Sequence, residues 1–188
     1  MMHHIDLSSV LRQTLACDLY SNLVTRPTGA AVRTQIEHLL GDTDAADARA
    51  LTIIDFSHVS MIDFSCADEV VAKLLMRYAS HDAPRDAYFL FRGVSDDHWV
   101  AIEAALERHG LALAVENADG VKVAGVVSDE ERSMWEVVYR LGSANADDVA
   151  IATGADSTHV RDALDALCVR RLVMRANDEY VAVGHFQS

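Results

Sequence analysis

The sequence predicts an α/β fold for roughly its first two thirds, followed by a smaller unit of helices and a hairpin. Up to about residue 127, apolar segments of strand length alternate with segments whose apolar residues recur at helical spacing. Such alternation is typical of helices layered on a sheet. From residue 128 onward the helical segments follow one another directly, so we place the boundary between residues 1–127 and residues 128–188.

Amino-acid composition limits both the kind of protein this is and the kind of partner it binds. The chain has 188 residues, of which 51% are hydrophobic, and 16 basic residues stand against 29 acidic ones, for a net charge of -13. This acidic surface disfavours nucleic acid and anionic membrane and favours protein partners. No run of about 18 apolar residues and no secretory signal is present, so we expect a cytoplasmic protein. The cysteines, Cys17, Cys66 and Cys168, are expected to be reduced thiols.

The elements of the first unit follow from apolar spacing and from turn residues. A strand is expected within residues 15–25, and the Arg-Pro-Thr-Gly sequence at 26–29 predicts a turn. Ser95 is a helix cap, and Gly110 ends the same helix. The remaining elements are a helix over 29–40, a buried strand over 51–56, a helix after 65, a strand over 88–91, and strands over 111–115 and 121–126.

The second unit opens with a capping box at residues 128–131, and its first helix ends at Gly142. A short helix precedes Gly154, and we expect Leu141 and Ile151 to face inward on these two helices. A third helix follows Asp156. Strands over 172–175 and 179–183 then form a hairpin with its turn at 177–178. Three helices followed by a two-stranded wing are typical of a winged helix.

The most informative segment is residues 51–75, which predicts a buried strand, a polar loop and an amphipathic helix. A helix start is electropositive and has unpaired N–H groups, so it suits contact with an acid or a phosphate. Ser65 is either a phosphoacceptor or the N-cap of this helix. We favour the cap, because Asp63, Asp68 and Glu69 would repel a phosphate. These four residues are our candidate partner-binding set, with Asp68 and Glu69 complementing the helix dipole or facing a basic partner.

Residues 52–55 (Thr-Ile-Ile-Asp), the approach at 59–63 and the helix from Ser65 resemble the STAS family, the domain of bacterial anti-sigma factor antagonists and sulfate-transporter tails. The resemblance covers about residues 10–127. It implies a STAS-like mixed sheet with helices and a regulatory protein partner of kinase or anti-sigma type. In the family a serine or threonine directly after the loop Asp is phosphorylated. Here Phe64 holds that position, and Ser65 stands one place later.

The second unit raises the alternative of DNA binding. Its third helix and wing offer five candidate residues, namely Thr158, Arg161, Arg170, Arg171 and Arg175. Residues 128–188 hold six arginines, no lysine and eleven acidic residues, however, and a DNA reader normally presents a basic face. We therefore favour a protein-docking or dimerising winged helix. Arg170 and Arg171 are then expected to pair with acids of the first unit.

These patterns together predict a non-enzymatic regulatory or adaptor protein that docks a protein partner through residues 57–70, with no cofactor or metal. The chain could also form a homodimer. The alternative is a DNA-binding transcriptional regulator with the STAS-like unit as sensor, and a small-molecule pocket beside the helix at Ser65 is a third reading. Asp55 and Asp63 are weak candidates for acid–base chemistry, because no base or lysine accompanies them. Arg26 is an anion clamp or, as we favour, a loop charge.

Overall fold

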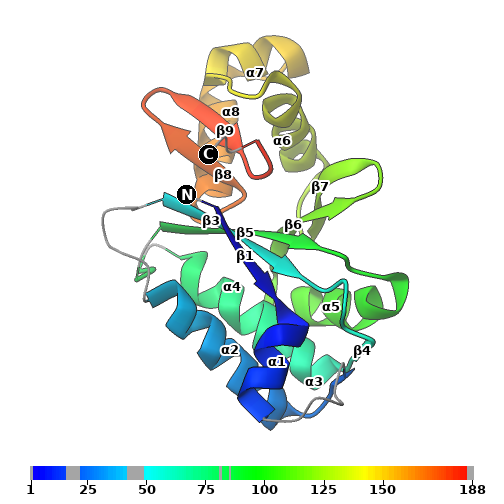
Figure 1. Ribbon diagram of the computed structural model, residues 1–188. Helices are drawn as coiled ribbons and strands as arrows, with labels where there is room; N and C mark the ends of the chain where they lie inside the picture. The colour runs from blue at the N-terminus through cyan, green and yellow to red at the C-terminus, as the bar shows by residue number, and fades with distance from the viewer. Residues whose placement is uncertain (1, 16–21, 42–48, 81, 85, 186–188) are drawn as a thin grey trace.

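The computed structural model describes residues 2–15, 22–41, 49–80, 82–84 and 86–185. Its centre is a five-stranded sheet with the strand order β1-β3-β5-β6-β7 (Figure 1). The first four strands are parallel to one another, and β7 is antiparallel to β6 at the edge. The predicted α/β class is therefore confirmed, with a mostly parallel sheet. The strands are β1 (Met2–Asp6), β3 (Arg49–Asp55), β5 (Asp86–Arg92), β6 (Ala112–Asn117) and β7 (Gly120–Gly125).

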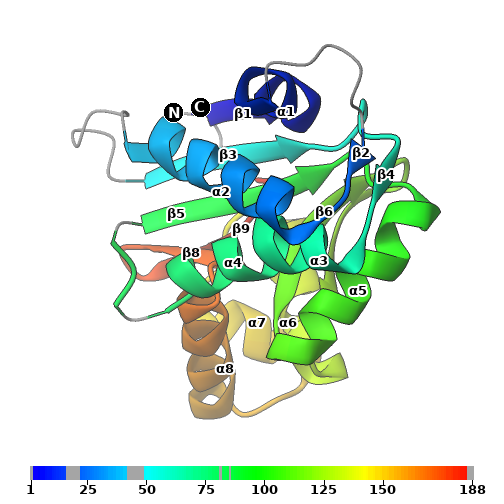
Figure 2. The ribbon, with the colours of Figure 1, turned by 90° about the horizontal axis from the view of Figure 1, so that it is seen from below.

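The helices that connect the parallel strands lie together on one face of the sheet (Figures 1 and 2). The strands lie side by side in the order in which they occur in the chain. Because their crossover connections share one handedness, the connecting helices all pack on the same face of the sheet. Two very short parallel strands, β2 (Asn22–Leu23) and β4 (Met61–Ile62), pair beside this layer. The helical segments are α1 (Leu7–Leu15), α2 (Arg26–Gly41), α3 (Phe64–Ala67), the π-helical turn η1 (Asp68–Ala72), α4 (Lys73–Tyr78) and α5 (Asp96–His109).

Both faces of the sheet are buried, which explains why its strands are continuously apolar. On the face toward the helices, Ile54, Phe89 and Phe91 belong to the main core. On the opposite face, Ile53 and Leu90 pack in a second cluster that includes Val183 from the C-terminal segment. The C-terminal elements thus cover the face that the crossover helices leave open.

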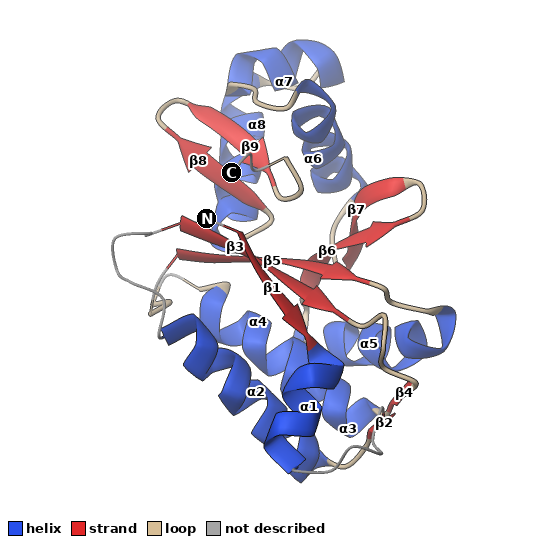
Figure 3. Ribbon diagram, in the orientation of Figure 1, coloured by secondary structure: helices blue, strands red, loops and turns tan. Residues whose placement is uncertain are grey.

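The C-terminal elements are three helices followed by a hairpin (Figure 3). They have their own core, in which Trp135 and Tyr180 are fully buried, and the Trp135 indole donates a hydrogen bond to the Leu172 carbonyl at 2.9 Å. The predicted capping box at Ser128 and the predicted helix after Asp156 are confirmed, and Asp156 is the N-cap of that helix. The elements are α6 (Asp129–Leu141), α7 (Ala146–Thr153), α8 (Ser157–Val169), β8 (Val173–Ala176) and β9 (Glu179–Ala182).

Arg171 joins the C-terminal elements to the sheet. Its guanidinium donates to the Tyr78 carbonyl at 3.0 Å, pairs with Asp86 at 2.8 Å and lies over the Tyr88 ring at 5.7 Å. The residue adopts a φ of 59°, in the left-handed region that side chains other than glycine rarely occupy. The predicted pairing of Arg171 with an acid of the first unit is therefore confirmed.

The N-terminal quarter differs from the prediction. The sequence patterns missed β1 and α1. Among the described residues, the strand expected within residues 15–25 is present at Asn22–Leu23 and absent at Leu15, which ends α1, while residues 16–21, including Cys17, lie outside the described residues. The predicted turn at 26–29 is wrong, because α2 begins at Arg26. Proline is tolerated in a first helical turn, where its missing N–H has no intrahelical acceptor.

Two side chains that were expected in the second core face solvent instead. Leu141 is 52% exposed and Ile151 is 84% exposed. Leu141 is the last residue of α6, and Ile151 follows the buried pair Val149 and Ala150 on α7. Leu141 ends its helix, and Ile151 lies on the solvent-facing side of α7, so apolar spacing alone placed both wrongly.

Replacing Arg171 with alanine is expected to lower the free energy of unfolding by about 2 kcal/mol, because a charged hydrogen bond, an ion pair and a ring contact are lost together. Arg161→Ala is the matched control, since Arg161 is exposed on α8 and its loss should change stability by less than about 0.5 kcal/mol. Urea denaturation of both variants measures the difference. Equal stabilities of the two variants would show that Arg171 is not the link described here.

Candidate functional site

The junction between β3 and the following helix is capped by Asp63. Asp63 has an extended backbone, and one of its carboxylate oxygens accepts from the Cys66 N–H and from the Ser65 hydroxyl, both at 2.8 Å. The other oxygen accepts from the Thr25 N–H at 3.0 Å. Asp63 is therefore the N-cap, and the prediction that Ser65 fills this role is wrong because Ser65 already lies inside α3.

The position of Ser65 bears on the alternative that this residue is a phosphoacceptor. The side chain is half-buried, and its hydroxyl proton is donated to Asp63. A phosphoryl group on this oxygen would lie against the Asp63 carboxylate that caps the helix, so like charges would meet at contact distance. The expectation that Ser65 is not phosphorylated stays a prediction, and this geometry supports it.

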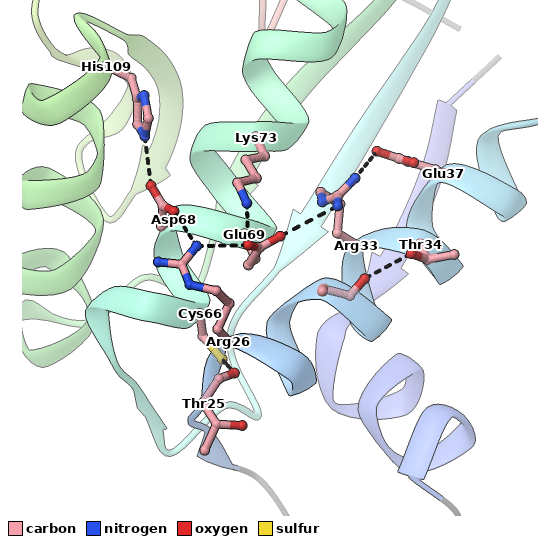
Figure 4. Close-up of polar contacts among 11 residues, drawn as sticks. Thr25, Arg26, Arg33, Thr34, Glu37, Cys66, Asp68, Glu69, Lys73 and His109 are labelled. Carbon is pink, nitrogen blue, oxygen red and sulfur yellow. Dashed lines mark hydrogen bonds and ion pairs between the residues drawn. The ribbon is translucent and has the colours of Figure 1, made fainter.

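Asp68 and Glu69 do not face solvent, which corrects the expectation that they form a partner-binding surface. Only 4% of Asp68 and 3% of Glu69 is exposed. Both lie in η1, which packs between α2 and α5, so this turn of the helix has no solvent-facing side. Arg26 reaches both carboxylates, at 2.8 Å from Asp68 and 2.9 Å from Glu69 (Figure 4).

Arg33, Lys73 and the His109 imidazole complete the contacts of these two acids. His109, at the end of α5, lies 2.7 Å from the second oxygen of Asp68. Glu69 is also paired with Arg33 at 3.5 Å and with Lys73 one helical turn later (Figure 4). We name the set Arg26, Arg33, Asp68, Glu69, Lys73 and His109 the buried ion cluster. It ties α2, the helix after the loop and α5 together.

Electrostatics keeps both acids of the cluster ionised. Burial raises the pKa of Asp68 and of Glu69, but the hydrogen bonds and charges of their partners outweigh it, so each pKa falls below its usual value. For Asp68 the principal partner is Arg26, and for Glu69 it is Lys73. Arg26 is thus neither an anion clamp nor a simple loop charge. Its side chain is half exposed, but its charge is engaged by two buried acids of the same molecule.

A glycine on α2 lets this helix approach the helix formed by α3 and η1 closely. A Cβ atom at Gly29 would lie 2.9 Å from the Glu69 Cβ and 3.0 Å from the Cys66 Cα, so only glycine fits there. The Cys66 thiol donates to the Thr25 carbonyl at 3.0 Å. Burial, followed by the Asp63 charge, raises the pKa of the Cys66 thiol to about 12. This thiol is therefore neutral at physiological pH and is a packing group rather than a nucleophile.

The loop before the helix is the exposed part of the junction. We name residues 57–61, which end at the first residue of β4, the presenting loop. The His58 side chain is 71% exposed and Met61 is 51% exposed, while Val59 is buried and anchors the loop from below. The Ser57 N–H donates to the Asp55 carboxylate at 2.9 Å, which fixes the start of the loop to the end of β3. A half-exposed methionine is thus presented from a fixed scaffold.

Asp55 and Asp63 each have their own set of donors. Asp55 contacts His4 at 2.7 Å, the Ser57 N–H at 2.9 Å and Arg92 at 3.5 Å. Burial raises the pKa of Asp55, but the hydrogen bonds from Ser57 and His4 and the charge of Arg92 outweigh it and lower the pKa to about 2. A carboxylate held this way is a poor proton acceptor at neutral pH, so Asp55 anchors the loop.

The five candidate DNA-contacting residues do not form one exposed basic surface. Thr158 and Arg161 are exposed on α8. Arg170 was expected to pair with an acid of the first unit, and this prediction is wrong. Arg170 instead pairs with Glu131 of α6 at 3.3 Å, and it also donates to the Val126 carbonyl. Arg171 is the link to the sheet described above. Arg175 lies 3.5 Å from Asp165 and over the Tyr180 ring.

Comparisons of this sequence with protein families and with curated proteins find no match. Within the described residues, no three His, Cys, Asp or Glu side chains gather in a way that could hold a metal ion. In the same part of the chain, no helix has both the length and the apolar content needed to cross a membrane.

Replacing Glu69 with glutamine is expected to cost about 2 kcal/mol of stability, because a buried group loses its charge-assisted hydrogen bonds at nearly constant volume. Glu179→Gln makes the same chemical change at an exposed position of β9 and should be close to neutral. Thermal and urea unfolding report both values. If the two variants unfold alike, the buried ion cluster contributes nothing measurable.

The lowered pKa of Asp55 predicts an acid-dependent loss of stability. Because the folded pKa of about 2 lies below the unfolded value of about 3.9, the contribution is complete above about pH 4 and disappears as the pH falls through about 2. Its size is about 2 kcal/mol. Asp55→Asn should therefore show a flatter dependence of unfolding free energy on pH between 4 and 2 than the wild type. Parallel curves for the two proteins would contradict this assignment.

Proposed function

We propose that this chain is a non-enzymatic regulatory or adaptor protein that docks a protein partner through the presenting loop and the adjoining helix start. The observation that carries the proposal is Met61, a half-exposed apolar side chain beside exposed polar residues on a loop held by Asp55 and Asp63. Binding loops on rigid scaffolds are a common arrangement for recognition. Asp68 and Glu69 are therefore not part of the proposed contact surface. They stabilise it through the buried ion cluster.

The charges around the presenting loop suggest how a partner is recognised. Asp63 is saturated with three donors, and Arg26 is neutralised by two buried acids. The long-range electrostatic attraction of this surface is therefore small. Docking through it depends on shape and on apolar contact with Met61, in the way that a few anchor residues dominate many interfaces.

We further propose that residues 1–127 form a STAS-like unit and residues 128–188 a winged helix. Support comes from the helices gathered on one face of a mostly parallel sheet and from three helices followed by a hairpin. A cytoplasmic protein with a kinase or anti-sigma type partner fits this proposal, and it needs no cofactor. The alternative of DNA binding is weaker, because Arg170 and Arg171 are engaged within the molecule.

The docking proposal is tested by Met61→Asp, which places a charge at the proposed apolar anchor without disturbing a buried residue. Met76→Asp on α4 is the matched control, because Met76 is similarly exposed, at 46% compared with 51% for Met61. Immobilised wild type and variants are used to capture partners from the native cells. Each captured protein is then purified and its affinity is measured by calorimetry.

We expect a partner that binds the wild type and Met76→Asp with equal affinity and binds Met61→Asp at least tenfold more weakly, which corresponds to about 1.4 kcal/mol. Circular dichroism confirms that both variants stay folded. A partner that binds Met61→Asp as tightly as the wild type, or that is lost equally from both variants, would contradict docking through the presenting loop.

A further inference from the structure

A groove of about 750 Å³ lies where the two parts of the chain meet, between α5 and the segment that leads from β7 into α6. Glu103 and Glu107 line it from α5, and Val126 and Val127 line it from the connecting segment. Val126 is 44% exposed, so the groove offers apolar surface to an occupant. The groove belongs to other elements than the presenting loop, and the inference below does not depend on the proposed function.

The two glutamates of the groove carry uncompensated charge. Glu103 and Glu107 are exposed and stand four residues apart on α5, where like charges repel by about 0.2–0.5 kcal/mol. Across the described ranges of the chain, neither glutamate has an ion pair or hydrogen bond to a basic side chain. This contrasts with Asp68, Glu69 and Glu37 in the same helical layer, each of which is paired with at least one cation.

The opposite side of the groove offers no cation in compensation. The only basic side chain that lines the groove is Arg170, and its guanidinium is already shared between Glu131 and the Val126 carbonyl. Glu131 in turn accepts from the Ser128 N–H at 2.9 Å. The groove therefore presents an apolar strip beside two unpaired negative charges. Such a surface complements a ligand that carries positive charge and an aliphatic group together.

We propose that this groove binds an extended basic segment of a protein partner, with two cationic side chains on Glu103 and Glu107 and an aliphatic side chain on Val126. Spacing favours an extended peptide. Four residues of helix rise about 6 Å, and side chains at alternate positions of an extended chain are about 6.6 Å apart. A Lys-Val-Lys sequence thus matches both glutamates and leaves its central side chain for the apolar strip. A second copy of this chain is disfavoured as occupant by its net charge of -13.

The test uses the full chain, labelled with ¹⁵N, and the probe peptide acetyl-Gly-Lys-Val-Lys-Gly-amide, titrated at low salt. The groove variant is Glu103→Gln with Glu107→Gln. The control variant is Glu136→Gln with Glu179→Gln, which removes the same charge from exposed positions outside the groove. Acetyl-Gly-Glu-Val-Glu-Gly-amide is the control peptide, and spermine is the control cation.

The proposal predicts chemical-shift changes centred on residues 103–110 and 125–128, equal affinity for the wild type and the control variant, and an affinity at least tenfold lower for the groove variant. The Glu-Val-Glu peptide should not bind. Three results would each overturn the proposal: no shift changes in the wild type at millimolar peptide, equal weakening in both variants, or spermine binding as tightly as the peptide at the same glutamates.

Discussion

The structure depends on the burial of two ionised acids, Asp68 and Glu69, within the helix layer. An unpaired buried charge is costly, and removing one partner of a buried pair typically destabilises a protein by about 3–5 kcal/mol. Each acid therefore stabilises the fold only while its partners stay in place. These partners are the cations of α2 and α4 and the imidazole at the end of α5. The same contacts fix the helix start from which the presenting loop projects.

The central sheet is held in place because both of its faces are covered. The crossover helices pack on one face, and Val183 and Arg171 bring the C-terminal elements to the other. Loops at the ends of the strands are then the natural places for contact with other molecules, since the faces are occupied. The presenting loop and the groove beside α5 are two such places, and they differ in chemistry: one is electrostatically compensated, and the other carries unpaired negative charge.

Sequence patterns predicted the elements that local signals define and missed what tertiary contacts decide. The caps at Ser95 and Ser128 were predicted correctly, because a capping side chain and its helix are close in sequence. The burial of Asp68 and Glu69 could not be predicted, because acids on a helix normally face solvent and their partners lie far away in the chain. Gly29 led to a wrong prediction for a related reason: the sequence predicts that it ends a turn at 26–29, but in the structure it lies inside α2, where it allows the close contact with Glu69.

The central claim is that the presenting loop is the surface that meets a protein partner, and photo-crosslinking tests it most directly. A photoreactive phenylalanine analogue is placed at His58, whose side chain is 71% exposed, and in a second protein at Asp162 on the exposed side of α8. Both proteins are irradiated in the native cells. We predict one discrete adduct from position 58 and none of the same mass from position 162. Adducts from position 162 alone would contradict docking through the loop.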